Sequence, residues 1–269
     1  MTLPPSRLRV CLVQINAGND VAANLGRLKS LVSRLGAADV IALPEVFAVR
    51  GGPEEYRSNA QPLPGPLTNF LAAIARRHNA WVLAGSLIES AGGRFFNTSV
   101  LLNRRGEIAA SYRKIHLFEA ELESGQIIRE ADAYEAGDAP VMADVEGWRC
   151  GMAICYDLRF PELFRHYSAQ GAHLFFLPSN FTQRTGRDHW EVLLRARAIE
   201  NQCFVVAPNQ CGVNPRNGVE SYGHSMVVGP WGEVLCEIET AEHAASVVLD
   251  PQALAHTRRR IPALTHRRL

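Results

Sequence analysis

The sequence predicts an α/β domain in which helices cover a mixed β-sheet. Short apolar segments of strand character alternate with segments of helical periodicity, and Gly-containing turns join several neighbouring strands. The composition is that of a globular protein, with 47% hydrophobic and 20% charged residues among 269. A chain of this length buries roughly 75% of its unfolded surface. We therefore expect one domain over residues 1–269 that folds without a disulfide or a metal.

The first half of the chain alternates strands and helices. Apolar residues recur at helical spacing between 25 and 35 and between 67 and 74, and Gly36 is typical of a helix end. Turns at 91–93 and 104–107 separate the later strands. The strands expected here are 9–15, 40–43, 81–88, 95–102 and 108–112.

The second half resumes this alternation after a polar, acidic stretch. Residues 117–138 show little periodicity, so we interpret them as a functional loop. Helices are expected over 161–170 and 187–201, and residues 256–269 form a basic tail that we expect to pack on another surface. The strands expected here are 150–154, 174–177, 204–207, 225–228, 234–238 and 245–249.

Charge and cysteine usage exclude several classes of protein. The net charge of +1 gives no electrostatic reason to expect binding to nucleic acid or to an anionic membrane surface. No apolar stretch approaches the roughly 18 residues of a membrane span, and the first residues lack the pattern of a secretory signal. Six cysteines without a Cys-x-x-Cys pair and nine scattered histidines indicate a cytoplasmic protein with reduced cysteines and no metal or other cofactor.

Lysine is rare in this chain, and one lysine stands out. Of the 28 basic residues, only Lys29 and Lys114 are lysines. Lys29 falls on the polar face of an expected helix, whereas Lys114 follows an arginine that would serve equally well as a generic cation. Because lysine is a compact charge whose pKa can be shifted, Lys114 is a candidate for specific chemistry.

Three polar residues, Glu45, Lys114 and Cys155, stand at the ends of expected strands. In open α/β folds, ligands bind beyond the carboxyl ends of the strands, so these side chains can meet in one crevice. Taken singly, a helix cap, a surface charge or a core cysteine explains each of them. Together they supply a base, a cation and a thiol, which is the set that activates a cysteine nucleophile. A cysteine–histidine pair is the competing arrangement, and His116 is its only candidate.

The segments around these residues resemble the signature segments of the nitrilase superfamily of carbon–nitrogen hydrolases. These segments are Leu43–Glu45, Tyr112–Phe118 and Cys155–Glu162. They occur in the family's order, and the resemblance covers essentially the whole chain. It implies an α-β-β-α sandwich that pairs into dimers. It also implies that Cys155 is the nucleophile, Glu45 the general base and Lys114 the stabiliser of the tetrahedral intermediate.

The same resemblance implies supporting roles for other residues. The backbone N–H of Tyr156 completes the oxyanion site, and Glu130 matches a further glutamate that orients the substrate or the base. Asn180 lies in the matching segment Pro178–Thr182 and is assigned to the substrate site. The implied reaction cleaves an amide C–N bond through a cysteine thioester, which water then hydrolyses.

Segments 222–232 and 262–268 look most like the branch that contains deaminated glutathione amidases. Omega-amidases acting on α-ketoglutaramate are the alternative, as are enzymes for other small aliphatic amides or N-carbamoyl compounds. Because both named substrates carry carboxylates, Arg159, Arg184 and Arg187 are candidates to bind them, although ordinary surface charge explains these arginines equally well. We expect a small amide and water as reactants and a homo-oligomer of two or more subunits.

Some residues depart from the pattern of this branch. Glu119 stands where aspartate is usual, Gly229 replaces a common aspartate, and residues 121–130 differ from the usual loop sequence. Because such loops shape specificity, we expect Glu119–Ala131 to line the mouth of the pocket. Two other functions stay open: acyl transfer to an amine, and partner binding by a scaffold through its basic tail.

Overall fold

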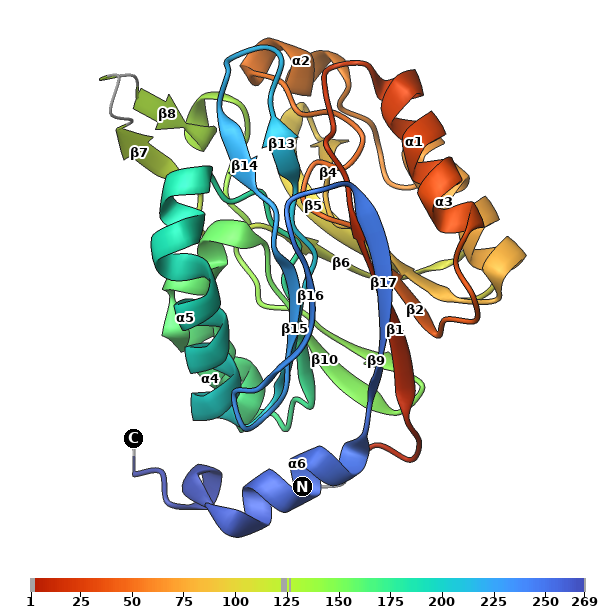
Figure 1. The fold of residues 1–269 in the computed structure, drawn as a ribbon. Coiled ribbons are helices and arrows are strands. Elements are labelled where there is room, and N and C mark those ends of the chain that lie inside the picture. The colour runs from red at the N-terminus through yellow and green to blue at the C-terminus, as the bar shows by residue number, and fades with distance from the viewer. Residues whose placement is uncertain (1–2, 122–124, 126, 269) are drawn as a thin grey trace.

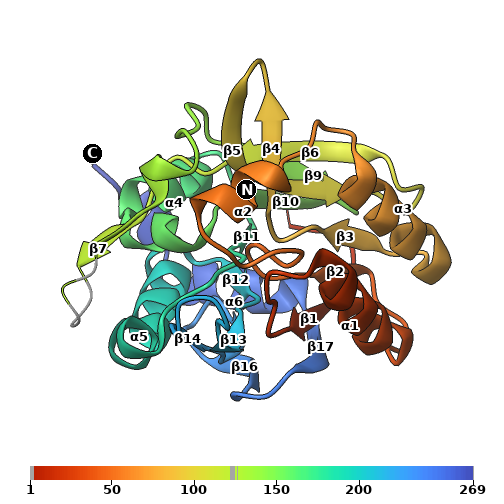
Figure 2. The same cartoon turned by 90° about the horizontal axis from the view of Figure 1, so that it is seen from above.

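The computed structural model describes residues 3–121, 125 and 127–268. Two β-sheets face each other at its centre, and helices cover the outer face of each sheet (Figures 1 and 2). Apolar side chains of both sheets share one core, and a second core fills the space between the first sheet and its helices. The predicted α-β-β-α sandwich is confirmed.

The first sheet has seven strands in the order β17-β1-β2-β3-β5-β4, with β6 also paired to β5. Its strands are β1 (Leu8–Gln14), β2 (Val40–Ala42), β3 (Trp81–Leu83), β4 (Leu87–Ala91), β5 (Arg94–Leu102), β6 (Ile108–Arg113) and β17 (His243–Leu249). Strands β1, β2 and β3 are parallel, and the other pairs are antiparallel. The parallel strands lie inside the molecule, which explains why they are continuous apolar runs.

The second sheet has six strands in the order β16-β15-β12-β11-β10-β9. Its strands are β9 (Met142–Val145), β10 (Trp148–Met152), β11 (Leu174–Phe176), β12 (Phe204–Ala207), β15 (Ser225–Val228) and β16 (Val234–Ile238). Strands β10, β11 and β12 are parallel. Two small antiparallel pairs lie outside the sheets, β7 (Glu119–Glu121) with β8 (Ile127–Arg129), and β13 (Cys211–Val213) with β14 (Glu220–Tyr222).

Helices form the two outer layers. Helices α1 (Val21–Ser33) and α3 (Pro66–His78) cover the first sheet, and α4 (Pro161–Ala169) and α5 (Gln183–Asn201) cover the second (Figure 1). The shorter helices are α2 (Pro53–Ser58), η1 (Glu130–Asp132), η2 (Cys155–Arg159) and η3 (Ala263–Thr265). The predicted 117–138 loop contains the β7–β8 hairpin and η1, and the hairpin projects from the body of the molecule.

The predicted strand 81–88 is wrong in one respect, because the structure divides it into β3 and β4. Gly85 causes the break. Its φ of +62° lies in the left-handed region, and a Cβ there would stand 1.9 Å from the carbonyl oxygen of Pro44. Glycine tolerates both the positive φ and the close approach. The chain that leaves β2 can therefore pass against this corner, which places Glu45 at the edge of the sheet.

The C-terminal segment begins as a helix, α6 (Pro251–Arg260), which includes the start of the expected tail. Asp250 caps this helix, since its carboxylate accepts a backbone N–H of the first turn at 2.9 Å. Arg258 donates to the carbonyl oxygen of Ala172 at 2.8 Å. Helix α6 thus packs across the end of the molecule opposite the β7–β8 hairpin (Figure 1).

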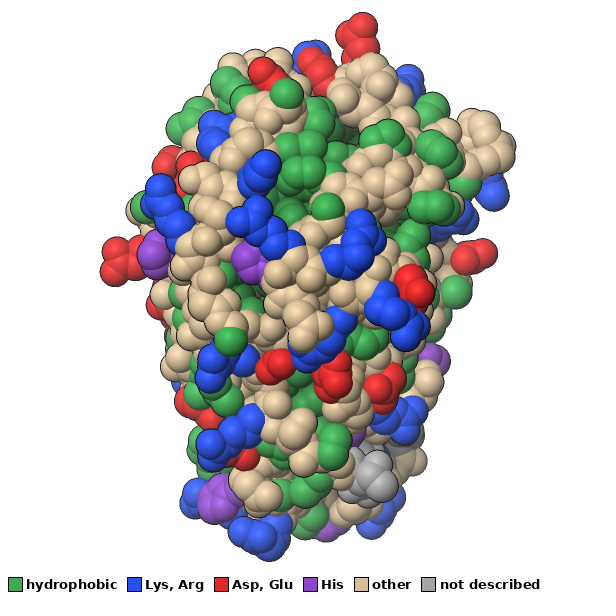
Figure 3. Space-filling view, turned by 90° about the vertical axis from the view of Figure 1, so that its right-hand side faces the viewer, with side chains coloured by type: hydrophobic (Ala, Val, Ile, Leu, Met, Phe, Trp, Pro, Cys, Tyr) green, Lys and Arg blue, Asp and Glu red, His purple; other side chains and the backbone are tan. Residues whose placement is uncertain are grey.

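The surface carries charges of both signs. Basic and acidic side chains occur side by side on the face shown in Figure 3, in keeping with the nearly balanced charge of the sequence. Among the helices of the described residues, none combines the length and apolar character that crossing a membrane requires.

Candidate active site

A cavity of about 330 Å³ opens at the end of the molecule where α2, the β7–β8 hairpin and the β13–β14 pair lie. Glu45, Glu130 and Cys155 are in its wall, together with aromatic side chains such as Tyr56 and Phe118. The volume is at the lower end of the range for small-molecule sites. Within the described ranges, no three His, Cys, Asp or Glu side chains are grouped closely enough to hold a metal ion.

Glu45 reaches the cavity from the end of β2. The next residue, Val46, has a φ of +50°, and its N–H donates to the hydroxyl of Ser86 at 3.0 Å. The carbonyl oxygen of Glu45 accepts from the side-chain amide of Gln210 at 2.9 Å. These two contacts hold the backbone of Glu45 and Val46 in place. Glu45 itself is 3% exposed.

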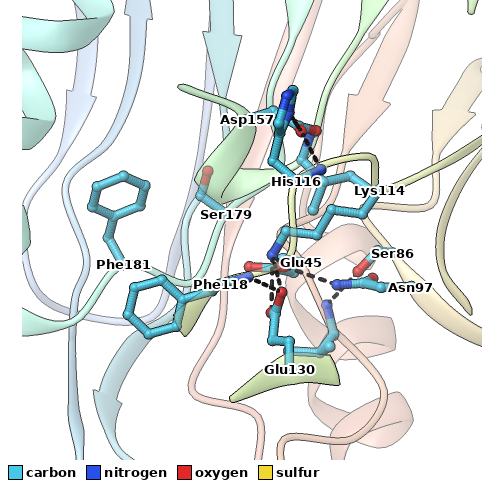
Figure 4. Close-up of polar contacts among 12 residues, drawn as sticks. Glu45, Ser86, Asn97, Lys114, His116, Phe118, Glu130, Asp157, Ser179 and Phe181 are labelled. Atoms are coloured by element: carbon cyan, nitrogen blue, oxygen red, sulfur yellow. Dashed lines mark hydrogen bonds and ion pairs between the residues drawn. The ribbon is translucent and has the colours of Figure 1, made fainter. Parts of the chain in front are cut away.

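Lys114 follows β6 and is fully buried. Its Nζ lies 2.9 Å from Oε1 of Glu45 and 2.8 Å from Oε2 of Glu130, so that one ammonium joins two carboxylates (Figure 4). Burial alone would lower the pKa of Lys114, but the charges of Glu130 and Glu45 outweigh it and raise this pKa well above the ordinary value. Lys114 is therefore a permanent cation at neutral pH.

Glu130 connects this cluster to the wall of the cavity. Its carboxylate accepts the backbone N–H of Phe118 at 2.8 Å, in addition to the bond from Lys114 (Figure 4). Burial raises the pKa of Glu130, while the charge of Lys114 partly opposes that shift. The two residues that bracket the β7–β8 hairpin, Phe118 and Glu130, are thus tied to each other and to the buried ammonium.

Cys155 begins η2, directly after β10 and the two residues that follow it. Its φ of +46° is unusual for a residue with a side chain, and its N–H is held by the carbonyl oxygen of Pro178 at 3.0 Å. Burial and the nearby Glu45 raise the pKa of the thiol well above its usual value, against the opposing effects of Lys114 and the backbone N–H of Asn180. The thiol is therefore neutral at rest and needs a base.

Asp157 clamps the chain around Lys114 to the chain around Cys155. One carboxylate oxygen accepts from the Ile154 N–H at 2.8 Å and from the Tyr112 hydroxyl at 2.7 Å. The other accepts from the His116 N–H at 3.1 Å and lies 2.7 Å from Nδ1 of the same histidine (Figure 4).

The contacts of His116 bear on the alternative cysteine–histidine pair. Besides its bond to Asp157, its ring stacks on Phe160 with ring centroids 3.7 Å apart. Among the described residues that line the cavity, His116 is absent, whereas Cys155 and Glu45 are present. Glu45, which shares the cavity wall with Cys155, is therefore better placed than His116 to exchange a proton with the thiol.

Replacement of Asp157 by alanine is expected to lower the free energy of unfolding by about 3 kcal/mol, because the buried Tyr112 hydroxyl and Ile154 N–H lose their acceptor. Urea unfolding at neutral pH measures the change. Asp188, which is exposed on α5, provides the matched control, since its replacement by alanine should leave the unfolding midpoint unchanged. Equal midpoints for the two variants would contradict the clamp.

The residues expected to contact substrate are distributed unevenly. Tyr156, Asn180 and Arg159 line the cavity. Arg184 and Arg187 are exposed on α5 and are not among the described residues of its wall. Both lie on the solvent side of this helix, which the sequence pattern did not predict. Arg159 lies 5.7 Å from the ring centroid of Phe181 and within 3.3 Å of His189.

Other arginines line the cavity that no sequence pattern indicated. Arg129 pairs with Glu119, and Arg216 pairs with Glu55. Arg50 is 1% exposed and donates to the hydroxyl of Ser221 at 2.6 Å; burial lowers its pKa to about 10.

The loop expected to line the mouth of the cavity does so in part. Of the expected range Glu119–Ala131, the segment 127–130 is in the wall, whereas residues 122–124 and 126 lie outside the described residues. The apolar Ile127 and Ile128 and the charged Arg129 therefore face the same cavity as the carboxylates, so that the mouth offers both apolar and basic contacts.

Known proteins resemble this chain over nearly its whole length. The family model described as carbon-nitrogen hydrolase matches residues 9–259. Deaminated glutathione amidase of Yersinia enterocolitica is 37% identical over 268 residues, covering 96% of this chain and 92% of that protein. Omega-amidase NIT2 of Danio rerio is 33% identical over 265 residues, covering 98% of this chain and 95% of that protein.

A solved structure agrees with these sequence matches. Saccharomyces cerevisiae Nit3, a member of branch 10 of the nitrilase superfamily, superposes with a TM-score of 0.90 at 28% identity, over 100% of this chain and 99% of that chain. The family match over residues 9–259 includes Glu45, Lys114, Glu130 and Cys155. The protein belongs to the carbon–nitrogen hydrolase family, within the nitrilase superfamily.

Proposed function

We propose that the protein hydrolyses the amide C–N bond of a small carboxylate-bearing metabolite, with deaminated glutathione as the first candidate. The observation that carries this proposal is the ammonium of Lys114, buried between Glu45 and Glu130 in the same site as the neutral thiol of Cys155. The likeness to deaminated glutathione amidase supports the substrate, and the likeness to omega-amidase makes α-ketoglutaramate the second candidate.

The proposed reaction starts with proton transfer from Cys155 to Glu45. The thiolate attacks the amide carbonyl carbon, and the negative charge that develops on oxygen is met by Lys114 and the backbone N–H of Tyr156. One such donor typically contributes about 3–4 kcal/mol. Glu45 returns its proton to the nitrogen, the C–N bond breaks, and the amine leaves a thioester on Cys155. The same carboxylate then deprotonates water, which releases the acid and restores the thiol.

Arginines in the cavity wall supply the proposed carboxylate contacts. Arg159 has aromatic and histidine neighbours and no carboxylate among its described partners, so its guanidinium is available for a bidentate bond to a substrate carboxylate. Asn180 lies in the same wall and accepts from the Ser221 hydroxyl at 2.6 Å, which leaves its amide N–H₂ as a donor. We assign both residues to substrate binding.

A substrate panel tests the proposed function. Release of the amine or of ammonia is measured from deaminated glutathione, α-ketoglutaramate, glutamine, simple aliphatic amides and N-carbamoyl amino acids. We expect the highest kcat/KM for deaminated glutathione. Preference for α-ketoglutaramate would replace the first candidate by the second, and no turnover of any compound would overturn the substrate class. Added hydroxylamine reports acyl transfer, because a transferase would form hydroxamate in preference to acid.

We also propose that the protein is a cytoplasmic homodimer that pairs through α5. Val192 and Ile199 on this helix are 67% and 51% exposed, and Trp231 and Ile261 nearby are 44% and 52% exposed. A Cβ at Gly232 would lie 2.6 Å from the Ile199 side chain, so the helix and the 229–233 turn form one apolar surface. Six free cysteines fit a reducing compartment.

Sedimentation analysis tests this pairing. The wild-type protein is expected to sediment as a dimer, and Ile199→Glu as a monomer, because a charge would be buried in the interface. Val248→Glu, at a valine on β17 that is 42% exposed, serves as the control and should stay dimeric. A monomeric wild-type protein at micromolar concentration would overturn the proposal.

A further inference from the structure

Asn97 lies between the two charged groups that the proposed reaction uses. It belongs to β5 in the first sheet and is 1% exposed. Its side-chain Nδ2 donates to Oε1 of Glu45 at 2.9 Å, and its backbone carbonyl oxygen accepts the N–H of Lys114 at 2.9 Å (Figure 4). One residue thus contacts both the carboxylate and the segment that carries the ammonium.

The two donors to Glu45 bind the same oxygen. Nζ of Lys114 and Nδ2 of Asn97 both lie 2.9 Å from Oε1. A carboxylate held at one oxygen by two donors from different directions has its rotation fixed. Oε2 is then the oxygen that remains to take the proton of Cys155. Lys114 supplies one of these two donors while its ammonium also binds Glu130, and Asn97 supplies the donor that serves Glu45 alone.

The side chain of Asn97 is suited to orienting the Glu45 carboxylate rather than to filling space in the core. Its Oδ1 is buried and has no partner among the described residues, so the side chain is satisfied only through the bond to Glu45. A leucine here would pack as well but would leave Oε1 with one donor. An aspartate would place a third carboxylate around the single cation Lys114. A neutral donor is what this position requires.

We propose that Asn97 is a positioning residue for the base, which holds Glu45 so that Oε2 faces the thiol of Cys155. This inference rests on the proposed function. With Asn97→Ala, kcat is expected to fall about 10- to 100-fold with KM within about threefold of wild type, because general-base help is lost while substrate contacts stay.

Asn97→Asp separates positioning from packing. This variant keeps the shape of the side chain but replaces the N–H donor by a negative charge. It is therefore expected to lose more activity than Asn97→Ala. Ser99→Ala is the matched control: Ser99 lies on the same face of β5, is 1% exposed and has an unpartnered buried hydroxyl. Its kinetics should equal those of the wild type.

Alkylation of Cys155 by iodoacetamide, followed by mass spectrometry of the peptide, needs no substrate and keeps the two proposals distinguishable. The rate at neutral pH is expected to fall about tenfold in both Asn97 variants and to stay unchanged in Ser99→Ala. If the panel gives no turnover but alkylation slows as expected, the substrate class fails and the positioning role stands. Folded Asn97 variants with wild-type alkylation rates and wild-type kcat would overturn the role. Should the alanine variant not fold, the isosteric aspartate variant carries the comparison.

Discussion

Replacement of Cys155 by alanine is expected to abolish turnover, with kcat at least about 10⁴-fold lower, while unfolding stays cooperative. The reason is that no other group in the described site can form the thioester. Steady-state kinetics on the best substrate of the panel gives the loss, and mass spectrometry of the wild-type protein mixed rapidly with substrate should show the acyl adduct on Cys155 alone.

Cys236 provides the control for this experiment. It is partly buried on β16 in the second sheet, remote from the cavity wall, and its conversion to alanine should leave kcat and KM unchanged. Activity retained in Cys155→Ala would exclude the thioester mechanism. Activity lost in both variants would point to a general effect of cysteine removal on the fold.

Replacement of Lys114 by methionine is expected to cost about 3–5 kcal/mol of unfolding free energy at pH 7 and to remove activity. Methionine fills much of the same volume but leaves the carboxylates of Glu45 and Glu130 buried without a cation. The pKa of Glu130, which burial already raises, would rise further. The folded variant then binds more protons than its unfolded chain, so its deficit should shrink as the pH falls from 7 to 5.

Lys29, the other lysine of the chain, is the matched control. It is exposed on α1, and Lys29→Met should leave both stability and kinetics unchanged. Urea unfolding at the two pH values tests the prediction. A deficit for Lys114→Met that is the same at pH 5 and pH 7 would show that lost packing, rather than uncompensated charge, causes it.

The pairing of Glu45 with Lys114 could be predicted because the ends of strands can be recognised in the sequence. Lys114 directly follows β6, and Glu45 lies three residues after the end of β2. Because β6 runs in the same direction as β2, both residues lie at one edge of the first sheet. The contacts of Asn97 and Asp157 could not be predicted, because neither residue stands at the end of a strand. Asn97 lies inside β5, where a polar residue resembles an ordinary interruption, and Asp157 lies in a turn rich in polar residues. The run Asn97–Ser99, three polar residues within an apolar strand, was the available clue.

Errors in the elements have equally local causes. The apolar residues on both sides of Gly85 predict one continuous strand over 81–88. The break at Gly85 depends on its close approach to Pro44, a contact with a segment far away in sequence that a local pattern does not indicate. The start of α6 was missed although Asp250–Pro251 is a standard helix beginning. Whether Arg184 points toward the cavity or toward solvent depends on how α5 packs. The first turn of α5 is polar, so it has no apolar spacing from which the buried face could be predicted.

The bond from Phe118 N–H to Glu130 closes the β7–β8 hairpin at its base, next to the buried ammonium. The stretch between these two anchors can consequently vary without displacing the residues of the proposed reaction, since its ends are fixed by the buried cluster of Lys114, Glu45 and Glu130. It can be treated as an exchangeable cassette. Replacing the stretch between Phe118 and Glu130 by the corresponding stretch of another amidase should change the preferred substrate to that of the other enzyme and leave the hydrolytic step unchanged.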